Sequence, residues 1–172
     1  MNQDPFGAPE TLISRIYAYV AYRVGEGPTA EDITSDVFER ALRYRHTFDG
    51  RRGDVLGWLV GIARRCIHDA SHPDTLASAA EVDEPSDGID LERQAIVRLD
   101  VRAGLARLPE RDRELIALRY GADLPARRIG ELMGMKTNAV EVALHRALGQ
   151  LRELLSDQRM PEAEPISLEP NP

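Results

Sequence analysis

The segment LPARRIGELMGMKTNAVEVALHRALGQLRELL, residues 124–155, contains two helical patterns separated by a short turn. In the first pattern, Ile129, Leu132 and Met133 recur at the i, i+3, i+4 spacing of one helix face. Gly134 follows, and a glycine supplies the backbone freedom that a tight turn between helices requires. The segment therefore predicts a helix-turn-helix, a motif that can place one helix in a groove of DNA.

The second helix of this motif has an apolar side and a polar side. The apolar side is expected to pack on a core and consists of Val140, Leu144, Leu148, Leu151 and Leu155. Thr137 or Asn138 is placed to cap the start of the helix. The opposite side carries small or polar groups with little reason to be buried, namely Asn138, Ala139, Val142, His145, Arg146 and Gly149. This side is the candidate DNA-reading face, and the alternative is an ordinary pair of packed helices in a bundle.

The composition limits the size of the core and the compartment. With 172 residues, 30% charged and 5% aromatic, the chain can bury one modest core or two small ones. We find no long apolar run and no charged-then-apolar leader, so we expect a cytoplasmic protein without membrane insertion. The single cysteine, Cys66, excludes an internal disulfide and is expected to act as a small buried apolar group.

The distribution of charge matters more than the total. A net charge of −7 argues at first against nucleic acid, because a phosphate-binding protein needs local positive potential. Residues 91–155, however, hold 12 basic and 9 acidic side chains, whereas residues 74–90 hold six acids and no lysine or arginine. The part that contains the helix-turn-helix is net positive, so the overall acidity does not exclude DNA.

The same segments divide the chain into domains. Residues 74–90 combine acid, serine, proline and glycine, which is typical of a flexible linker, and residues 156–172 are predicted to form a disordered acidic tail. We therefore predict an all-α fold with two small helical domains, residues 1–73 and 91–155, joined by a flexible acidic linker.

Helical patterns fill both predicted domains. The first helix, residues 10–24, gathers Leu12, Ile13, Ile16, Tyr17 and Val20 on one side. A second helix is expected to be capped by Thr29, with Asp32 three positions on, and to bury Ile33, Val37, Ala41 and Leu42. A third helix is expected from residue 55 to about 70. After the linker we expect a helix over 91–107 and, with Pro109 near its first turn, another to about residue 120.

Three blocks of this chain, in this order, resemble the signatures of bacterial extracytoplasmic-function (ECF) sigma factors. The blocks AEDITSDVFERAL (30–42) and WLVGIARR (58–65) resemble the N-terminal domain of that family, sigma region 2. The blocks LPERDRELIALRYGADLPARRIGELMGM (108–135) and NAVEVALHRALGQLREL (138–154) resemble its C-terminal domain, sigma region 4. The resemblance covers most of residues 10–155. It implies a dissociable initiation subunit of RNA polymerase, with no catalytic site and no cofactor of its own.

The resemblance also implies the partners. They are core RNA polymerase, through the clamp coiled coil and the flap of its two large subunits, then promoter DNA, and an anti-sigma factor. The positions that match the clamp-binding helix are Asp32, Ser35, Asp36, Glu39 and Arg40. An acidic face suits a basic partner surface, although a charged helix face without the resemblance usually means only solvation. Ser35 stands where the family usually has Gln.

A loop around residues 50–54 and the helix after it match the part of the family that opens the minus-10 promoter element. Adjacent arginines can follow the phosphates of a single strand, and glycines allow the backbone to approach a flipped base. The candidates are Arg51, Arg52, Asp54, Arg64 and Arg65. Trp58 is interpreted as a core anchor, because an aromatic at helical spacing usually packs in a core.

The resemblance assigns the helix-turn-helix to the minus-35 element in the major groove. Arg127, Arg128 and Lys136 are expected to contact phosphates. Glu141 and Val142 replace the usual Lys or Arg and Ser, and a carboxylate can accept a hydrogen bond from a cytosine amino group. The candidate positions are Arg127, Arg128, Lys136, Thr137, Asn138, Ala139, Glu141, Val142, His145 and Arg146.

Other classes of function are weaker. A stand-alone helix-turn-helix regulator is the main alternative, and it would bind duplex DNA tightly without polymerase. A metal site could use Cys66, His68 and His72, because the two histidines share a helix face, but no paired-cysteine motif accompanies them. An enzyme is disfavoured because the sequence has no glycine-rich phosphate loop and no nucleophile elbow.

Overall fold

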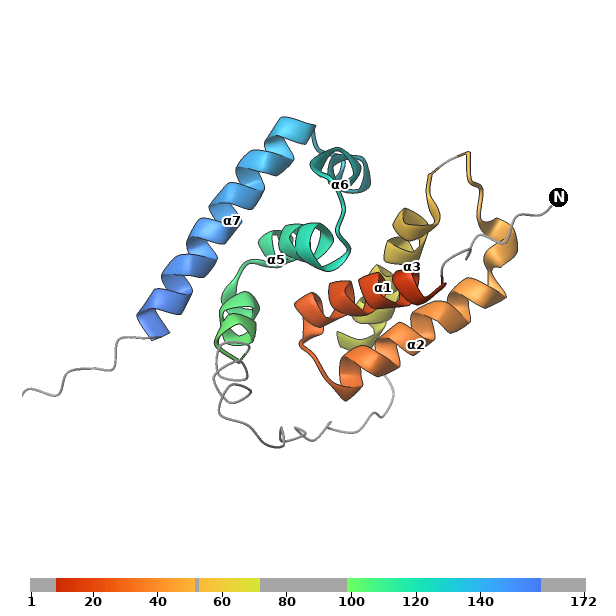
Figure 1. The fold of residues 1–172 in the computed structure, drawn as a ribbon, viewed down its shortest axis with the longest axis horizontal. Helices are drawn as coiled ribbons and strands as arrows, with labels where there is room; N and C mark the ends of the chain where they lie inside the picture. Colours follow the sequence, from red (N-terminus) through yellow and green to blue (C-terminus); the bar gives the residue numbers. More distant parts are fainter. Residues whose placement is uncertain (1–8, 52, 72–98, 159–172) are drawn as a thin grey trace, which may run out of the picture.

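The computed structural model describes residues 9–51, 53–71 and 99–158 (Figure 1). The regular elements in these ranges are all helical, which confirms the predicted fold class. In order they are α1 (Pro9–Val24), α2 (Pro28–Arg43), η1 (Arg45–Thr47), α3 (Val55–Ser71), a helix over 99–107, α5 (Glu110–Ile116), η2 (Ala117–Gly121), α6 (Ala126–Met133) and α7 (Thr137–Gln158). The predicted linker, residues 74–90, lies outside the described residues, as do residues 159–172 of the predicted tail. Residues 156–158, which were also predicted to be disordered, instead belong to the last turn of α7.

The start of α2 differs from the sequence prediction. Pro28 is the first helical residue, Gly27 is the N-cap with a φ of 113°, and no side chain caps the helix. Thr29 therefore lies inside the first turn, and the cap predicted at Thr29 is wrong. The first N–H groups of a helix have no partner within the helix, so proline, which has no N–H, fits well at this position. Glycine tolerates the positive φ of the residue just before it.

The buried faces of α1 and α2 also differ in part from prediction. Leu42, which was expected to be buried, is 57% exposed, and Ile13 of the apolar side predicted for the first helix is 45% exposed. Tyr19, outside the predicted stripe, is fully buried. α1 packs on α2 and α3 and also on η2. Its buried face is therefore wider than, and rotated from, the stripe expected for a helix that packs only within its own domain.

The helix after Pro109 changes geometry before it ends. The sequence predicts one helix to about residue 120, but α5 ends at Ile116 and the chain continues as the π-helical turn η2. The amide of Ala122 donates to the carbonyl of Ala117 at 2.9 Å, the i to i+5 bond that defines such a turn. The turn brings Gly121 so close to α1 that a Cβ there would lie 2.7 Å from the Cα of Tyr19.

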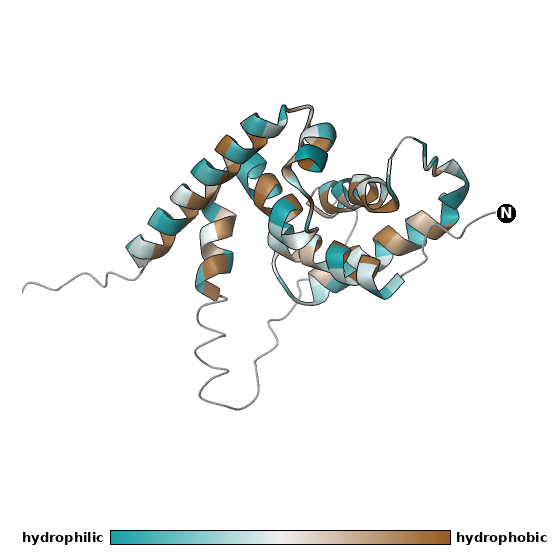
Figure 2. Cartoon of the chain, turned by 45° about the horizontal axis from the view of Figure 1, so that its top comes forward, coloured by the Kyte–Doolittle hydropathy of each residue, from teal (hydrophilic) through white to brown (hydrophobic). Residues whose placement is uncertain are grey.

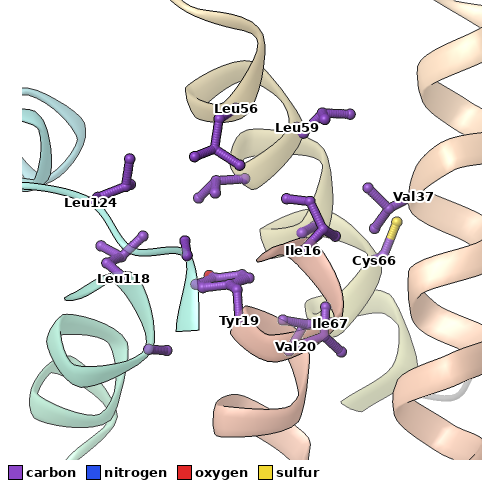
Figure 3. Close-up of a cluster of buried hydrophobic side chains, with 14 of the residues drawn as sticks. Ile16, Tyr19, Val20, Val37, Leu56, Leu59, Cys66, Ile67, Leu118 and Leu124 are labelled. Carbon is purple, nitrogen blue, oxygen red and sulfur yellow. The ribbon is translucent and has the colours of Figure 1, made fainter. Parts of the chain in front are cut away.

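Residues from both halves of the chain form one buried core. The N-terminal half contributes side chains such as Ile16, Tyr19 and Cys66, and Cys66 is buried as predicted. In Figure 3, Leu118 and Leu124 of the C-terminal half face Tyr19 of α1. The sequence predicted two separate small cores, and it gave no sign that the two halves pack together.

A second, smaller cluster holds α7 against the rest of the C-terminal half. Its buried members are Leu105, Leu108, Ile116 and Ala147. Figure 2 shows apolar and polar residues alternating along α7, as expected for a helix with one buried side and one solvated side. The arrangement leaves the polar side of α7 facing away from the core.

Candidate nucleic-acid and polymerase interface

The helix-turn-helix forms at the predicted positions, and two glycines define its turn. Gly134 ends α6 in the left-handed region with a φ of 65°. The amide of Met135 donates to the carbonyl of Gly130 at 2.8 Å. A Cβ on Gly130 would lie 2.5 Å from the carbonyl oxygen of Met135, so only glycine fits at that approach. Gly134 was predicted from the sequence as the turn residue, but the steric requirement for glycine at position 130 was not.

The predicted reading face of α7 is exposed. Val140, Leu144 and Ala147 point into the core. The side chains around the other side are exposed to solvent, as expected for a reading face: Asn138, Ala139, Glu141, Val142, His145 and Arg146. Val142 is 51% exposed, so its methyl groups are accessible to a thymine methyl group.

The basic residues at the ends of the motif differ in accessibility. Lys136 is exposed, and the Arg127 side chain is 79% exposed with its Nε 3.2 Å from Glu131 Oε1. Arg128 is only 24% exposed and pairs with Glu131 and with Asp54, 2.8 Å away in the N-terminal half. Partial burial acts to lower the pKa of Arg128, but its hydrogen bonds to Glu131 and Asp54 outweigh this and raise the pKa. Arg128 is therefore a charged group already held by two carboxylates. Thr137, the first residue of α7, is half-buried.

The candidates for the minus-10 element fall into two environments. Arg51 and Arg65 are exposed, whereas Arg52 lies outside the described residues. Asp54 caps α3, since its Oδ1 accepts a hydrogen bond from the amide of Gly57 at 2.7 Å. The Arg64 Nε donates to Glu114 Oε1 at 2.7 Å. In this conformation Arg51 and Arg65 are free at the surface, whereas Asp54 and Arg64, although partly exposed, are engaged in contacts within the molecule.

A basic and aromatic pocket of ≈ 550 Å³ lies between the end of α2 and α3. It is lined by Arg40, Arg43, Tyr44, Thr47, Trp58, Ile62 and Arg65. Trp58 packs partly against the core, as interpreted from the sequence, and its ring centroid lies 5.5 Å from that of Phe48. Arginines beside aromatic rings are the groups that hold unstacked bases and their phosphates. Arg43 and Tyr44 were not among the residues predicted from the sequence, where their only signal is their place at the end of α2, close to the arginine-rich loop.

The acidic face of α2 lies on the outside of the molecule. Asp32, Ser35 and Asp36 are exposed. Glu39 is exposed and forms an i, i+4 ion pair of 2.6 Å with Arg43. Arg40 is half-buried and pairs with Asp69 of α3 at 2.9 Å, and this hydrogen bond raises the pKa of Arg40. Arg40 thus ties α2 to α3, while the acids beside it remain accessible to a partner.

Two further features of the described residues bear on the alternatives. No group of three His, Cys, Asp or Glu side chains within them could hold a metal ion, and His72 of the considered cluster lies outside them. No helix in that part of the chain is long and apolar enough to cross a bilayer. The geometry described above is that of a helical protein with an exposed helix-turn-helix face.

Comparison with known proteins defines the family. Residues 10–71 match the family model for Sigma-70 region 2, and residues 98–151 match that for Sigma-70 region 4. The chain is 39% identical over 136 residues to the ECF RNA polymerase sigma factor ShbA of Streptomyces griseus, covering 72% of this chain and 70% of ShbA. It is 31% identical over 149 residues to the ECF RNA polymerase sigma factor BldN of Streptomyces coelicolor. That match covers 83% of this chain and 56% of BldN.

The fold is also known. It is similar to the sigma factor RpoE of Bartonella quintana, solved in complex with the anti-sigma factor NepR, with a TM-score of 0.58. The sequence identity is 19%, and the match covers 86% of this chain and 94% of that chain. This likeness shows the fold, and the matches to Sigma-70 regions 2 and 4 define the class, a sigma-70-type initiation factor. Within that class, the chain belongs to the ECF RNA polymerase sigma factors. Such alternative sigma factors are DNA-binding initiation factors and are not enzymes in themselves, and this favours the initiation factor over the stand-alone regulator.

Proposed function

We propose that this sigma factor docks on core RNA polymerase through α2 and directs it to promoters with both halves of the chain. Residues 1–73 would open and hold the minus-10 element, and residues 91–155 would bind the minus-35 duplex. The observation that carries the proposal is the exposed polar face of α7, the second helix of the helix-turn-helix, in a chain of this family.

The minus-35 element is proposed to lie against that face. His145 and Arg146 carry the donors that suit base edges and phosphates, and Val142 can contact a thymine methyl group. Glu141 can accept from a cytosine amino group, which favours a sequence different from that read by a lysine or arginine at this position. The exposed Arg127 and Lys136 would contact phosphates at the ends of the motif and set its register.

The minus-10 element is proposed to pass over the loop after α2 and the pocket beside it. Arg51 would follow the single-strand phosphates with its neighbour Arg52, and Arg65 would line the pocket. Tyr44 and Trp58 add aromatic faces on which a base can stack, each such contact contributing about 1–3 kcal/mol. This extends the sequence-based set by an aromatic platform.

Polymerase is proposed to bind the exposed acids of α2. Asp32 and Asp36 lie one turn apart on that face, together with Ser35 and Glu39. Carboxylates on one face complement a basic surface such as the clamp coiled coil, and they speed encounter as well as fix orientation. The flap of the other large subunit would receive the C-terminal half.

An anti-sigma factor is proposed as a further partner. The fold is similar to that of an RpoE solved with its anti-sigma factor, which makes a comparable regulator a reasonable expectation here. Because core polymerase and promoter DNA are cytoplasmic, the chain is proposed to act in the cytoplasm.

The test of this proposal reverses charge on α2. The double variant Asp32→Lys and Asp36→Lys should weaken association with core polymerase about tenfold or more, since attraction is replaced by repulsion. The affinity of each chain for core polymerase is measured by surface binding, with the polymerase immobilised and the salt concentration moderate.

A matched control reverses two exposed acids outside the proposed face, Glu10→Lys and Glu26→Lys, and adds the same charge. It should bind core polymerase like the parent chain. Equal loss in both double variants would mean that net charge, rather than the α2 face, governs association, and the docking proposal would be abandoned.

A further inference from the structure

A second pocket, of ≈ 540 Å³, lies between the last turns of α1 and the helix over 99–107. In Figure 1 that helix, drawn in green, lies beside the end of α1. This α1 pocket has the size of a site for a small organic ligand, about 300–1,000 Å³. None of the residues proposed to bind DNA or polymerase lines it. Its lining is mainly apolar, and an apolar ligand body would be removed from water against it: Ala21, Tyr22, Val24, Val101, Leu105 and Ala106.

Two arginines give the α1 pocket unused hydrogen-bond donors. Arg102 of the helix over 99–107 and Arg113 of α5 both line it. Within the described residues neither forms an ion pair, and their one hydrogen bond is a long one, 3.4 Å from Arg113 to the carbonyl oxygen of Leu108. The Nε–H of Arg113 is buried and has no acceptor in that part of the chain. Because buried donors are normally paired, guanidinium groups in this state suit an anion that enters the pocket.

The end of α1 holds the Arg102 guanidinium at the pocket. Gly25 lies there with a φ of 94°, and a Cβ on it would lie 2.3 Å from the Nε of Arg102. Glycine therefore leaves the space that the guanidinium fills. The negative end of the helix dipole also favours a cation at this place. The position of Arg102 thus follows from the backbone of α1 and needs no carboxylate partner.

The balance of charge around the α1 pocket is positive. Arg23 also lines it, but ion pairs with two glutamates of α5 neutralise that arginine. Arg102 and Arg113 remain, against the one carboxylate of the lining, that of the exposed Glu26. Two cations beside an apolar wall complement a ligand that has one negative group and an apolar body.

We propose that the α1 pocket binds a small amphipathic anion, a molecule with an apolar body and one carboxylate, sulfonate or phosphate group. The apolar body lies against side chains such as Tyr22 and Leu105. The anionic group accepts charge-assisted hydrogen bonds from Arg102 and Arg113. Binding at this site requires neither polymerase nor promoter DNA, so it can be tested independently of the proposed function.

Fluorescence titration of the full chain with anilinonaphthalene sulfonate, an aromatic anion that becomes fluorescent in apolar surroundings, tests the proposal. The neutral control is phenylnaphthylamine, which has the same rings without the sulfonate. The parent chain should bind about one anion, about tenfold more tightly than the neutral compound, because the hydrogen bonds to the charged group are lost in the latter. The anion should also raise the midpoint of thermal unfolding, as a ligand of the folded state does. No binding, many weak sites, equal affinity for both compounds or a lowered midpoint would overturn the proposal.

The arginines are tested by removing their charge. The double variant Arg102→Gln and Arg113→Gln should bind the anion about tenfold more weakly and the neutral compound as the parent does. The control, Arg107→Gln with Arg152→Gln, removes the same charge at two exposed positions outside the pocket and should bind like the parent. Equal loss in both double variants would mean that net charge governs binding, and the site would be rejected.

The apolar part of the pocket is tested by filling it. Ala106 is an exposed residue of the lining, so Ala106→Phe occupies the pocket without altering the core, and it should weaken binding of both compounds about tenfold. Ala103→Phe, one turn earlier on the same helix and outside the lining, should bind like the parent. Circular dichroism verifies that both variants keep their helix content. If Ala106→Phe binds the anion as tightly as Ala103→Phe, the dye binds elsewhere and the proposal fails.

Displacement of the dye from the parent chain defines the class of ligand. Dodecanoate, which combines a carboxylate with an apolar chain, should displace it. Inorganic phosphate at the same concentration should not, since it has no apolar body to bury. Displacement by phosphate alone would overturn the amphipathic class.

Discussion

Tyr19 and Glu114 are 95 residues apart in the sequence and form a direct hydrogen bond in the fold. Neither residue carries a local pattern that marks this pairing: Tyr19 lies off the apolar stripe expected for its helix, and Glu114 looks like one of many charges on an amphipathic helix. Side chains paired within one helix turn can be inferred from spacing, but a partner supplied by a distant segment cannot. This is why the residues at the junction were missed, whereas those on the face of α7 were found.

The hydroxyl of Tyr19 is expected to stabilise the fold. Tyr19→Phe keeps the ring and removes one donor to the buried Glu114, so it should lower the free energy of unfolding by about 1–3 kcal/mol at neutral pH. Urea unfolding of the full chain measures the change. Tyr120→Phe is the control, because Tyr120 is 50% exposed, and it should change stability by less than about 0.5 kcal/mol.

The stability difference between the parent chain and Tyr19→Phe is expected to depend on pH. Burial raises the pKa of the Tyr19 phenol above its ordinary value of 10.0, and nearby arginines only partly oppose this. The unfolded phenol then loses its proton at lower pH than the folded one, so this contribution is intact below pH 10 and is lost as the pH rises toward the raised pKa. The stability difference between parent and Tyr19→Phe should therefore shrink above pH 10. A difference that grows there would contradict the account.

At the scale of elements, most helices follow from local patterns. The apolar periodicity of residues 124–155, with Gly134 between the two stripes, was enough to predict α6, the turn and the polar face of α7. The π-helical turn η2 was not predictable in this way, because it accompanies the close contact of Gly121 with α1, which is a distant part of the sequence. The start of α2 shows a smaller effect of the same kind, because a proline and a positive-φ glycine there replaced the expected threonine cap.

The turn of the helix-turn-helix should be sensitive to one glycine in particular. Gly130→Ala places a Cβ 2.5 Å from the carbonyl oxygen of Met135 and should cost about 1–3 kcal/mol, as overpacking does. Gly149→Ala, in the open middle of α7, should be neutral or stabilising by about 0.5–1 kcal/mol, since alanine favours helix. Thermal unfolding ranks the variants. A Gly130→Ala protein as stable as Gly149→Ala would mean that the turn is looser than described.

For the whole molecule, the sequence was sufficient for the all-helical fold and the family, but not for the shared core. Each half carries its own amphipathic helices, and the composition of residues 74–90 is that of a linker, so two domains were predicted from the sequence. Tyr19 of α1 is buried against Leu118 and Leu124 of the other half. This contact depends on how the surfaces of the two halves fit together, and no single segment of the sequence determines that fit. The junction holds Arg64 and Arg128, two side chains that the sequence predicted to contact DNA.

We propose above that this chain gives core RNA polymerase its promoter specificity. The most direct measurement is run-off transcription by purified core polymerase on a genomic fragment library, with and without the chain, followed by mapping of transcript starts. The account predicts new starts that depend on the chain and share two upstream sequence elements. It also predicts their loss with Asp32→Lys and Asp36→Lys, and with His145→Ala and Arg146→Ala. Transcript starts that are identical with and without the chain would contradict it.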